Sequence, residues 1–479
     1  MTVDREKTVD RKGSLDKMIA RRDLFKMSGG AIFLAAGATA MPQWAGKLLK
    51  PLAAPGSAVS ASPAPSVYRH LAGTDGWIHL RGSVPLSFPD DLAPAERLGG
   101  MYNFGFRDVT ALDLGLPTPS TTINPLILGQ KGKVQASAPM LVFDEGDAIQ
   151  LTLTNLGLQQ RPDLTDSHTV HWHGFRNALP TFDGVPEMST SVPISADFPY
   201  YYHPTDPGTY MYHCHFEDVE HVQMGMTGIV FVRPAQNKTG AGTAPVARYA
   251  GGTATGAPLG YTYNDGNGAT AYDREFGLFL TEAWASAHHA DAHIQVSDWS
   301  DYHADFWLMN GRTYPDTILP AGRGTNMATG DLIEPVGHPE LRYQPISSLI
   351  QCAAGDRVLL RFVNLGYTQS SMRLAGTRMH VIGKDATPLR GVGIGGRRTG
   401  ADTSYYTNTI HIGAGESYDA LFTAPAKVGA GYDTYLLHNA AMGAVATPGL
   451  PGLGGQLTEI RVYAAGSIPQ QTQPNEQVV

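Results

Sequence analysis

Cysteine is scarce in this chain, since only Cys214 and Cys352 occur among 479 residues. A fold built on several disulfides is therefore excluded, because two cysteines can form one bridge at most. Cys352 stands in Leu-Ile-Gln-Cys-Ala-Ala-Gly-Asp at the head of an apolar segment, where we expect a buried, unreactive thiol. Cys214 stands between two histidines, which is the setting of a metal ligand.

Clusters of basic residues are also missing. Lys and Arg number 35 against 43 Asp and Glu, and the formal net charge is -8. Because the basic residues are scattered along the sequence, no basic surface stripe is available to neutralise a phosphate backbone. This charge pattern excludes nucleic acid as a partner.

The apolar run near the N-terminus is too short for a membrane span. It extends from Met27 to Ala40, whereas roughly 20 residues are needed to cross a bilayer. The run follows the pair Arg21-Arg22 and ends in Ala-Thr-Ala, so we expect a twin-arginine export signal rather than a membrane anchor. The exported protein would be periplasmic, on the cell surface or extracellular.

Helical periodicity is scarce, and short β-branched runs bounded by Gly, Pro, Asn or Asp take its place. With 55 Gly and 33 Pro, the composition predicts an all-β chain, and its length suits two domains. An internal sequence repeat indicates that the two domains share the same fold. Both Phe143–Asn155 and Ala353–Asn364 contain a Gly-Asp turn followed by an apolar strand that ends in Asn.

Low-complexity segments predict where the domains begin and end. The N-terminal signal and a Pro/Ala-rich stretch cannot build a core, and the tail is too polar to fold alone. We expect a signal and linker at 1–66, a first domain at 67–235, a linker at 236–260, a second domain at 261–466 and a disordered tail at 467–479.

Six of the 17 histidines fall in two short runs, His168-Thr-Val-His171-Trp-His173 and His213-Cys214-His215 followed by His221. Successive side chains of an extended strand point to opposite faces. His171 and His173 therefore share one face while His168 points to the other. In the same way, His213 and His215 share a face and Cys214 points away from them. The alternation predicts two metal sites, one inside the domain and one outside.

The predicted inner site combines two imidazoles, a thiolate and a thioether. Its ligands are His168, Cys214, His221 and Met226. A His₂Cys set with a distant axial Met is the ligand signature of a blue-copper, or type 1, centre. Such a set suits both Cu(I) and Cu(II), so the site is built to pass single electrons.

The predicted outer site combines two His-x-His pairs. Its ligands are His171, His173, His213 and His215. Such pairs on neighbouring strands can hold copper ions at a domain or subunit surface. The alternative is that these are packing histidines satisfied by backbone carbonyls, which is the usual role of a lone histidine.

From about residue 100 to 462 the sequence resembles the multicopper oxidases. His-Thr-Val-His-Trp-His-Gly and His-Cys-His are similar to the family's copper motifs, and Asp183-Gly-Val-Pro and Pro207-Gly-Thr-Tyr-Met-Tyr212 to the segments around them. The resemblance implies two cupredoxin-like Greek-key β-sandwich domains. It also implies that His168, Cys214, His221 and Met226 bind type 1 copper, that His171 binds type 2 copper, and that His173, His213 and His215 bind the type 3 pair.

The chain departs from the family in the loop after the His-Cys-His motif. Five residues separate His215 from His221, where the family usually has three. The step of five from His221 to Met226 is the expected one, so we predict Met226 rather than Met224 as the axial ligand. Met224 is then a core residue or lies at the rim of the site.

A second departure is that the chain holds only half of the family's trinuclear ligand set, which takes eight histidines. The C-terminal half resembles the copper-free middle domain of three-domain oxidases, for example in Asn310-Gly-Arg-Thr-Tyr-Pro-Asp and Gly415-Glu-Ser-Tyr-Asp-Ala. Either a neighbouring subunit completes the outer site, in a homo-oligomer that could be a trimer, or the site holds fewer coppers.

Two alternatives remain open. His438 stands where the related copper nitrite reductases place a histidine lent by a neighbouring subunit, but the chain has His171 and Arg378 where those enzymes have an Asp and a His. A buried structural role is the other possibility for His438. The second alternative is a type 1 copper electron carrier or copper-binding protein without turnover, which the missing histidines would suit.

We expect the remaining histidines to be ordinary. The group His288, His289, His293 and His303 could bind a metal, but it falls in a polar stretch that we expect to be a solvated loop, and His203, His380 and His411 stand alone. Glu217, Asp218 and Glu220 should form a solvated rim near His221, and substrate docking is the alternative role for them. Gly391-Val-Gly-Ile-Gly-Gly lacks the βαβ context of a dinucleotide site and should be a loop.

The sequence as a whole predicts a copper-dependent oxidase. A small molecule or a metal ion would donate electrons at the exposed edge of the type 1 site, near His221. Electrons would leave Cys214 through the adjoining His213 and His215 for the outer site, where dioxygen is the expected acceptor. The reducing substrate is not determined by these motifs.

Overall fold

The computed structural model describes residues 65–84, 88–95, 100–113, 124–241, 245–249, 257–394 and 398–478. The predicted export signal and most of the Pro/Ala-rich stretch lie outside these residues. Within the described residues, no helix is long and apolar enough to cross a membrane.

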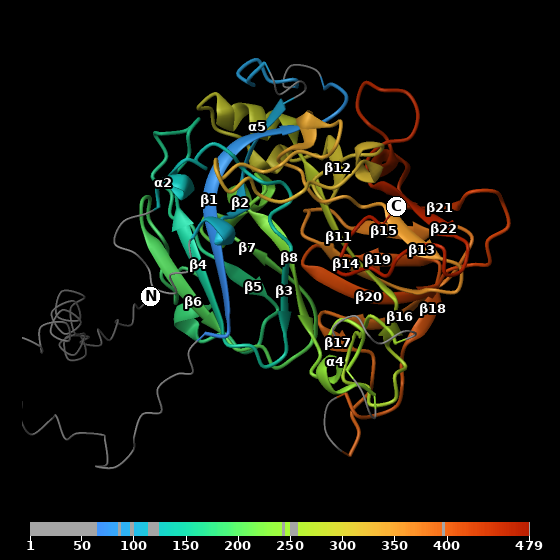
Figure 1. The fold of residues 1–479 in the computed structure, drawn as a ribbon. Coiled ribbons are helices and arrows are strands. Elements are labelled where there is room, and N and C mark those ends of the chain that lie inside the picture. Colours follow the sequence, from blue (N-terminus) through green and yellow to red (C-terminus); the bar gives the residue numbers. More distant parts are fainter. Residues whose placement is uncertain are drawn as a thin grey trace, which may run out of the picture. The chain divides into compact units, whose positions relative to one another are not determined.

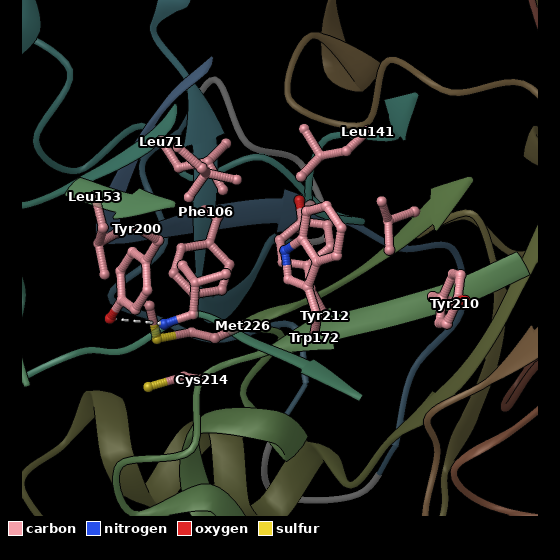
Figure 2. Close-up of a cluster of buried hydrophobic side chains, with 14 of the residues drawn as sticks. Leu71, Phe106, Leu141, Leu153, Trp172, Tyr200, Tyr210, Tyr212, Cys214 and Met226 are labelled. Atoms are coloured by element: carbon pink, nitrogen blue, oxygen red, sulfur yellow. Dashed lines mark hydrogen bonds between the residues drawn. The ribbon is translucent and has the colours of Figure 1, made fainter. Parts of the chain in front are cut away.

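The strands between residues 67 and 233 form a first pair of sheets, with the orders β2-β1-β4-β6 and β3-β8-β7-β5 (Figure 1). Their bounds are β1 (Val67–His79), β2 (Gly100–Asp108), β3 (Leu141–Asp144), β4 (Ile149–Asn155), β5 (His171–His173), β6 (Asp197–Tyr202), β7 (Gly208–His213) and β8 (Thr227–Arg233). Large apolar side chains such as Phe106, Trp172 and Tyr212 fill the core between the sheets, at one edge of which lies Cys214 (Figure 2).

The strands after residue 260 form a second pair of sheets, with the orders β12-β11-β14-β20-β16-β17 and β13-β22-β21-β15-β19, and β18 pairs with β16. Their bounds are β11 (Arg274–Ala283), β12 (Phe306–Met309), β13 (Ile350–Ala353), β14 (Arg357–Asn364), β15 (Ser370–Leu374), β16 (Met379–Lys384), β17 (Thr387–Pro388), β18 (Tyr405–Thr407), β19 (Thr409–Ile412), β20 (Glu416–Thr423), β21 (Asp433–Asn439) and β22 (Leu457–Tyr463). A small hairpin of β9 (Gly260–Tyr261) and β10 (Ala271–Tyr272) precedes them.

The two pairs of sheets share one topology. In the first, β1 runs parallel to β4 and antiparallel to β2, and in the second, β11 runs parallel to β14 and antiparallel to β12. The other two sheets correspond in the same way, so that β7 matches β21 and β5 matches β15. Gly146 and Gly355, in the repeated Gly-Asp turns, both adopt positive φ angles, of 85° and 90°. The all-β prediction is confirmed.

Helices are few and short in the described residues. They are α2 (Pro125–Leu128), α3 (Asp218–Gln223), α4 (Gln236–Thr239) and α5 (Ala285–Ala292), with 3₁₀ turns at η3 (Thr110–Leu112), η4 (Pro180–Phe182), η5 (Trp299–Asp301), η6 (Asp316–Ile318), η7 (Pro339–Leu341) and η8 (Met442–Val445). The prediction of a solvated loop at the histidines of α5 was wrong. Alanine is the strongest helix former and alternates with the polar residues there.

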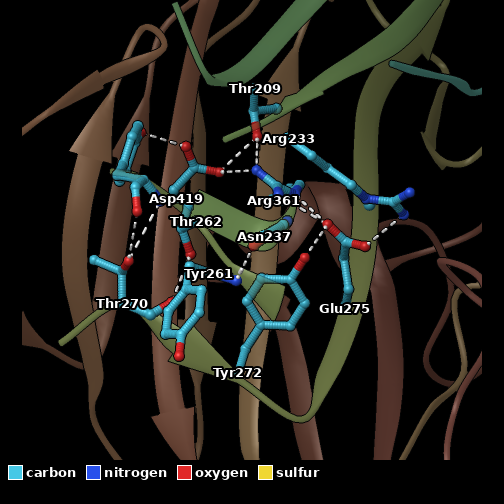
Figure 3. A network of polar contacts seen from close by, with 12 residues as sticks. Thr209, Arg233, Asn237, Tyr261, Thr262, Thr270, Tyr272, Glu275, Arg361 and Asp419 are labelled. Atoms are coloured by element: carbon cyan, nitrogen blue, oxygen red, sulfur yellow. Dashed lines mark hydrogen bonds and ion pairs between the residues drawn. The ribbon is translucent and has the colours of Figure 1, made fainter. Parts of the chain in front are cut away.

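A buried network of charges joins the two pairs of sheets (Figure 3). Thr209 of β7 donates a hydrogen bond to Asp419 of β20, and Arg361 of β14 donates to both. On its other side, Arg361 binds Glu275 of β11, which also accepts a hydrogen bond from Arg233 of β8. The strand that leads to Cys214 is thereby fixed to the second half. We propose that the domain limits, 67–235 and 261–466, fall on either side of this interface.

The C-terminal tail is ordered where the structure describes it, which corrects the prediction of disorder. The amide of Gln471 bonds both to the backbone NH and to the carbonyl of Glu275. Asn475 likewise accepts from the NH of Gly277 and donates to its carbonyl. Polar side chains of the tail thus form hydrogen bonds with backbone NH and C=O groups of β11. The tail can bind there without apolar side chains.

Candidate metal centre

The four predicted inner ligands converge at one edge of the first core. Ligand atoms of His168, Cys214 and His221 all lie within 4.8 Å of one another, and all three side chains are buried. The Cys214 Sγ lies 3.3 Å from Nδ1 of His221. The imidazole rings of His168 and His221 stand edge to face with centroids 5.1 Å apart.

Backbone hydrogen bonds fix the position of each inner ligand. His168 forms an isolated antiparallel bridge with Val192, and Cys214 follows directly on β7. The NH of Cys214 donates to the carbonyl of Met226, and the NH of Met226 donates to the carbonyl of His221. The long loop therefore closes on itself and brings three of the ligands together.

The two methionines of the loop have different environments. A Cβ placed on Gly73 would lie 2.7 Å from Cδ2 of His168 and 3.4 Å from Cε of Met226, so the Met226 side chain reaches the same spot as His168. Figure 2 shows Met226 beside Cys214. Met224 instead uses its carbonyl, which accepts from the Phe104 NH and the Asn103 amide. The Met226 side chain therefore lies close to His168, where the predicted axial ligand would be, whereas the Met224 carbonyl is bonded to β2.

The donor atoms of the inner group fit a bound metal ion. Both ring nitrogens of His168 are buried and have no hydrogen-bond partner in the described part of the chain, which is costly unless another ligand satisfies them. Burial alone would raise the pKa of Cys214, but the neighbouring His221 and His168 outweigh it and hold that pKa well below its ordinary value. A thiolate is the form of cysteine that binds metals. The sulfur also accepts a long hydrogen bond, 3.4 Å, from the Thr169 NH.

His221 is fully buried, which corrects the prediction that it forms the exposed edge of the site. His221 lies within α3, in the loop after β7, and the rings of Phe104 and Phe216 pack against the imidazole. Nε2 of His221 lies 3.6 Å from a carboxylate oxygen of Asp166, which is half-buried. Glu217 is the next carboxylate of this group and is exposed. Asp166 was not found from the sequence, because it precedes the histidine motif and carries no pattern of its own.

Strand alternation predicts the place of the outer histidines: His171 and His173 lie on β5, His213 ends β7 and His215 follows it. His171 pairs directly with His213 across the two strands, and ligand atoms of His171, His173 and His213 lie within 4.8 Å of one another. His215 falls outside that triplet, although its ring centroid is 5.2 Å from that of His171. Burial lowers the pKa values of His171 and His173 and brings that of His213 to about 3. These imidazoles are therefore neutral at pH 7, as metal ligands must be.

Hydrogen bonds orient two of the outer rings. Nδ1 of His171 donates to the carbonyl of Asp183, 2.7 Å away, and Nδ1 of His213 donates to the carbonyl of Cys214, 2.8 Å away. Each bond leaves Nε2 of its ring as the lone-pair donor, an arrangement typical of metal-bound histidines. The turn at Gly415 in the second half approaches the same group, because a Cβ there would lie 3.2 Å from Nε2 of His173.

Four histidines outside the two predicted sites form hydrogen bonds with nearby backbone or serine groups. His288 is buried and its Nδ1 bonds to the carbonyl of Tyr102, and burial lowers its pKa to about 4. His438 is half-buried on β21, and its Nδ1 donates to the carbonyl of the next residue, as in His213. His380 bonds to Ser404 and His411 to Ser371.

Comparisons with known proteins agree with this geometry. Sequence models described as multicopper oxidase match residues 132–237 and 275–449, and the first span contains all eight predicted ligands. Laccase-3 of Botryotinia fuckeliana is 24% identical over 295 residues, which are 61% of this chain and 48% of that protein. Laccase 1 of Metarhizium acridum (strain CQMa 102) is 32% identical over 108 residues, 22% of this chain and 16% of that protein.

The solved structure of the multicopper oxidase mgLAC has the same fold, with a TM-score of 0.52, 19% identity and coverage of 84% of this chain and 87% of that one. The chain matches less than half the length of the two laccases. The two matched spans nonetheless cover most of the described residues in both halves. The chain belongs to the multicopper oxidase family, whose members are copper-dependent oxidoreductases.

Proposed function

We propose that this protein is a copper-dependent oxidase that takes single electrons from a reducing substrate at the inner site and delivers them to dioxygen at the outer site. One observation carries the proposal. Cys214 belongs to the inner group, and its two neighbours in the chain, His213 and His215, belong to the outer face. The two sites are therefore joined by covalent bonds.

His168, Cys214, His221 and Met226 would hold type 1 copper. Copper bound there supplies one-electron redox chemistry. The four side chains are buried, so the surrounding core excludes water from the site. Backbone hydrogen bonds within the loop hold the ligand positions, which favours electron transfer because little reorganisation accompanies it.

The reducing substrate would dock at Asp166 and Glu217 rather than at His221 itself. Asp166 is close to the buried Nε2 of His221 and is partly exposed, and Glu217 stands beside it. A small molecule that donates a hydrogen bond or a metal ion would both suit these carboxylates. The site therefore limits the donor to groups that bind a carboxylate.

The outer histidines would hold type 2 and type 3 copper, and the remaining ligands would come from a second copy of the chain. The protein is then a homo-oligomer, for which a trimer is our proposal. Export by the twin-arginine route, to the periplasm, the cell surface or the medium, belongs to the same proposal and rests on Arg21-Arg22 and the apolar run after it.

Two variants test whether the inner site takes up electrons and the outer site reduces dioxygen. Cys214→Ser should abolish both the strong visible absorption of thiolate-to-copper charge transfer and dioxygen consumption, because an oxygen ligand cannot replace the soft sulfur. The double variant His171→Ala/His173→Ala should lose dioxygen consumption and keep the visible band. Absorption spectra and an oxygen electrode measure the two outcomes.

Two results would contradict the proposal. An intact blue band in the Cys214 variant would refute the type 1 assignment. Normal dioxygen consumption by the double histidine variant would show that the outer histidines are structural.

The second candidate is a type 1 copper electron carrier or copper-binding protein without turnover. It is favoured by the outer set, which provides four histidines where the family's cluster takes eight. Copper per chain, measured together with molar mass by light scattering, separates the two candidates, because a carrier would bind one copper per chain. Assays with nitrite as the electron acceptor test the nitrite reductase alternative.

A further inference from the structure

Four side chains that lie apart from both copper groups meet at the C-terminal end of α5. We call them the α5 site, and they are Asp90, Asp91, His289 and His293. Ligand atoms of Asp90, His289 and His293 all lie within 4.8 Å of one another. Nε2 of His293 is 3.1 Å from Oδ1 of Asp90 and 3.2 Å from Oδ1 of Asp91.

The helix places its two histidines on the same face. His289 and His293 are four residues apart, and the NH of His293 donates to the carbonyl of His289. Residues with this spacing are neighbours on a helix surface. Their rings are stacked, with centroids 4.0 Å apart and planes 21° from parallel. Their ligand nitrogens lie within 4.8 Å of each other, so both rings can bind the same ion.

Asp90 is a buried carboxylate with unused bonding capacity. Its side chain is 2% exposed. Oδ1 accepts hydrogen bonds from the Leu92 NH and from His293, whereas Oδ2 is buried and has no partner among the residues that the structure describes. Leaving a carboxylate oxygen buried and unpaired is costly. A cation bound beside the two histidines would satisfy it.

We propose that the α5 site binds a divalent transition metal ion such as Zn²⁺. Two imidazoles and two carboxylates are ligands that Zn²⁺ accepts, at distances of about 2.0–2.2 Å and usually in tetrahedral geometry. Small rotations of the side chains would draw the donor atoms together. Asp91 is 82% exposed, which gives an ion access from solvent. Neither copper group shares a residue with this site, and the inference goes beyond the proposed oxidase function.

An ion pair alone does not account for the site. A protonated His293 between Asp90 and Asp91 would explain two of the contacts. It leaves Oδ2 of Asp90 unsatisfied and gives no role to His289, whose ring lies against that of His293. A metal ion uses all four groups.

Calorimetric titration of the copper-loaded full-length protein with Zn²⁺ tests the proposal. We expect one Zn²⁺ per chain to bind at the α5 site, and this binding to disappear in His289→Ala/His293→Ala. His303→Ala/His338→Ala is the matched control, because these histidines belong to neither this site nor a copper group, and it should bind Zn²⁺ like the parent. Asp90→Asn should weaken the binding and serves as a second variant if the double variant folds poorly.

An unchanged visible copper band shows that each variant is folded. Identical Zn²⁺ binding by the parent, the double variant and Asp90→Asn would overturn the proposal. Equal loss in the control variant would also overturn it, because the binding would then be nonspecific surface chelation. Dioxygen consumption is measured separately, so failure of the α5 site leaves the oxidase proposal untouched.

Discussion

Met224 and Met226 are only two residues apart, yet they play different parts in the structure. The side chain of Met226 shares the neighbourhood of Gly73 with His168, and its carbonyl accepts a hydrogen bond from the Cys214 NH. The carbonyl of Met224 binds the backbone of β2. A Met side chain at the axial position of a blue-copper site tunes its reduction potential.

Met226→Leu should therefore leave the blue colour in place and raise the reduction potential, because the weak thioether ligand is lost while the His₂Cys set remains. Met224→Leu is the matched control, since it changes the same residue type in the same loop, and it should alter the potential little. Redox titration followed at the visible band measures both. If the Met224 variant shifts the potential and the Met226 variant does not, the two assignments must be exchanged.

The sequence predicted which residues meet at the inner site, because a thiolate between histidines and a following Met form a distinctive ligand set. It did not predict the burial of His221. Loop length shows that residues were added, but whether they extend into solvent or fold over the imidazole depends on packing by Phe104 and Phe216. The sequence also did not predict the role of Asp166, because only the tertiary structure brings this residue close to His221.

At the scale of elements, β1 contributes to the inner site through the smallness of Gly73. A Cβ added to this residue would lie 2.7 Å from the His168 ring, which is closer than side chains tolerate without movement. Gly73→Ala should displace His168, shift or weaken the blue absorption and destabilise the protein by about 1–3 kcal/mol through overpacking. Visible spectra, copper content and urea unfolding measure these effects.

Gly443→Ala is the control for this substitution. Gly443 lies in η8, and an added Cβ there would have no neighbour within 4 Å. Its spectrum and stability should stay close to those of the parent. A Gly73→Ala protein with the parent's spectrum would show that His168 has room to move without affecting the site.

Strand pattern was the dependable part of the sequence prediction, because apolar alternation and Gly-Asp turns are local signals. The helix α5 and the packing of the C-terminal tail were not predicted, because neither depends on a pattern of apolar residues. In α5, the alanines favour a helix, but the segment has no apolar stripe that would mark it as one. In the tail, Gln471 and Asn475 bind backbone groups of β11, a contact that hydrophobicity cannot reveal.

For the whole molecule, the network around Glu275 is one of several polar connections between the halves, together with ion pairs such as Arg81–Asp316 (Figure 3). Glu275 is fully buried and accepts bonds from Arg233, Arg248 and Arg361. Burial would raise its pKa, but the charges of the three arginines outweigh burial and hold that pKa well below its usual value. The charged form is therefore stabilised by folding.

Glu275→Gln should destabilise the protein by about 3–5 kcal/mol at pH 7, because it leaves buried arginines without their counter-charge. The folded pKa is lowered, so the contribution of Glu275 is fully present above its unfolded pKa of about 4.3 and is lost as the pH falls below that value. The difference in unfolding free energy between the parent and the variant should shrink in that range. Urea unfolding between pH 3 and 7 at about one-unit steps measures it.

The exposed Glu187 provides the control, since Glu187→Gln should change the unfolding free energy little at any pH in this range. A gap between the parent and Glu275→Gln that stays constant below pH 4 would contradict the role given to the ionised carboxylate.

The matching topology of the two halves bears on how the chain arose. On β21, His438 occupies the place that His213 has on β7, with the same bond from Nδ1 to the next carbonyl, and Asn439 stands where Cys214 would be. Opposite His438 is Arg373, where the first half has His171. Duplication and fusion of one ancestral gene would leave this kind of trace. The second half thus has a histidine in the same place and an asparagine where the first half has the cysteine, and its strands hold β7 through Asp419 and Arg361.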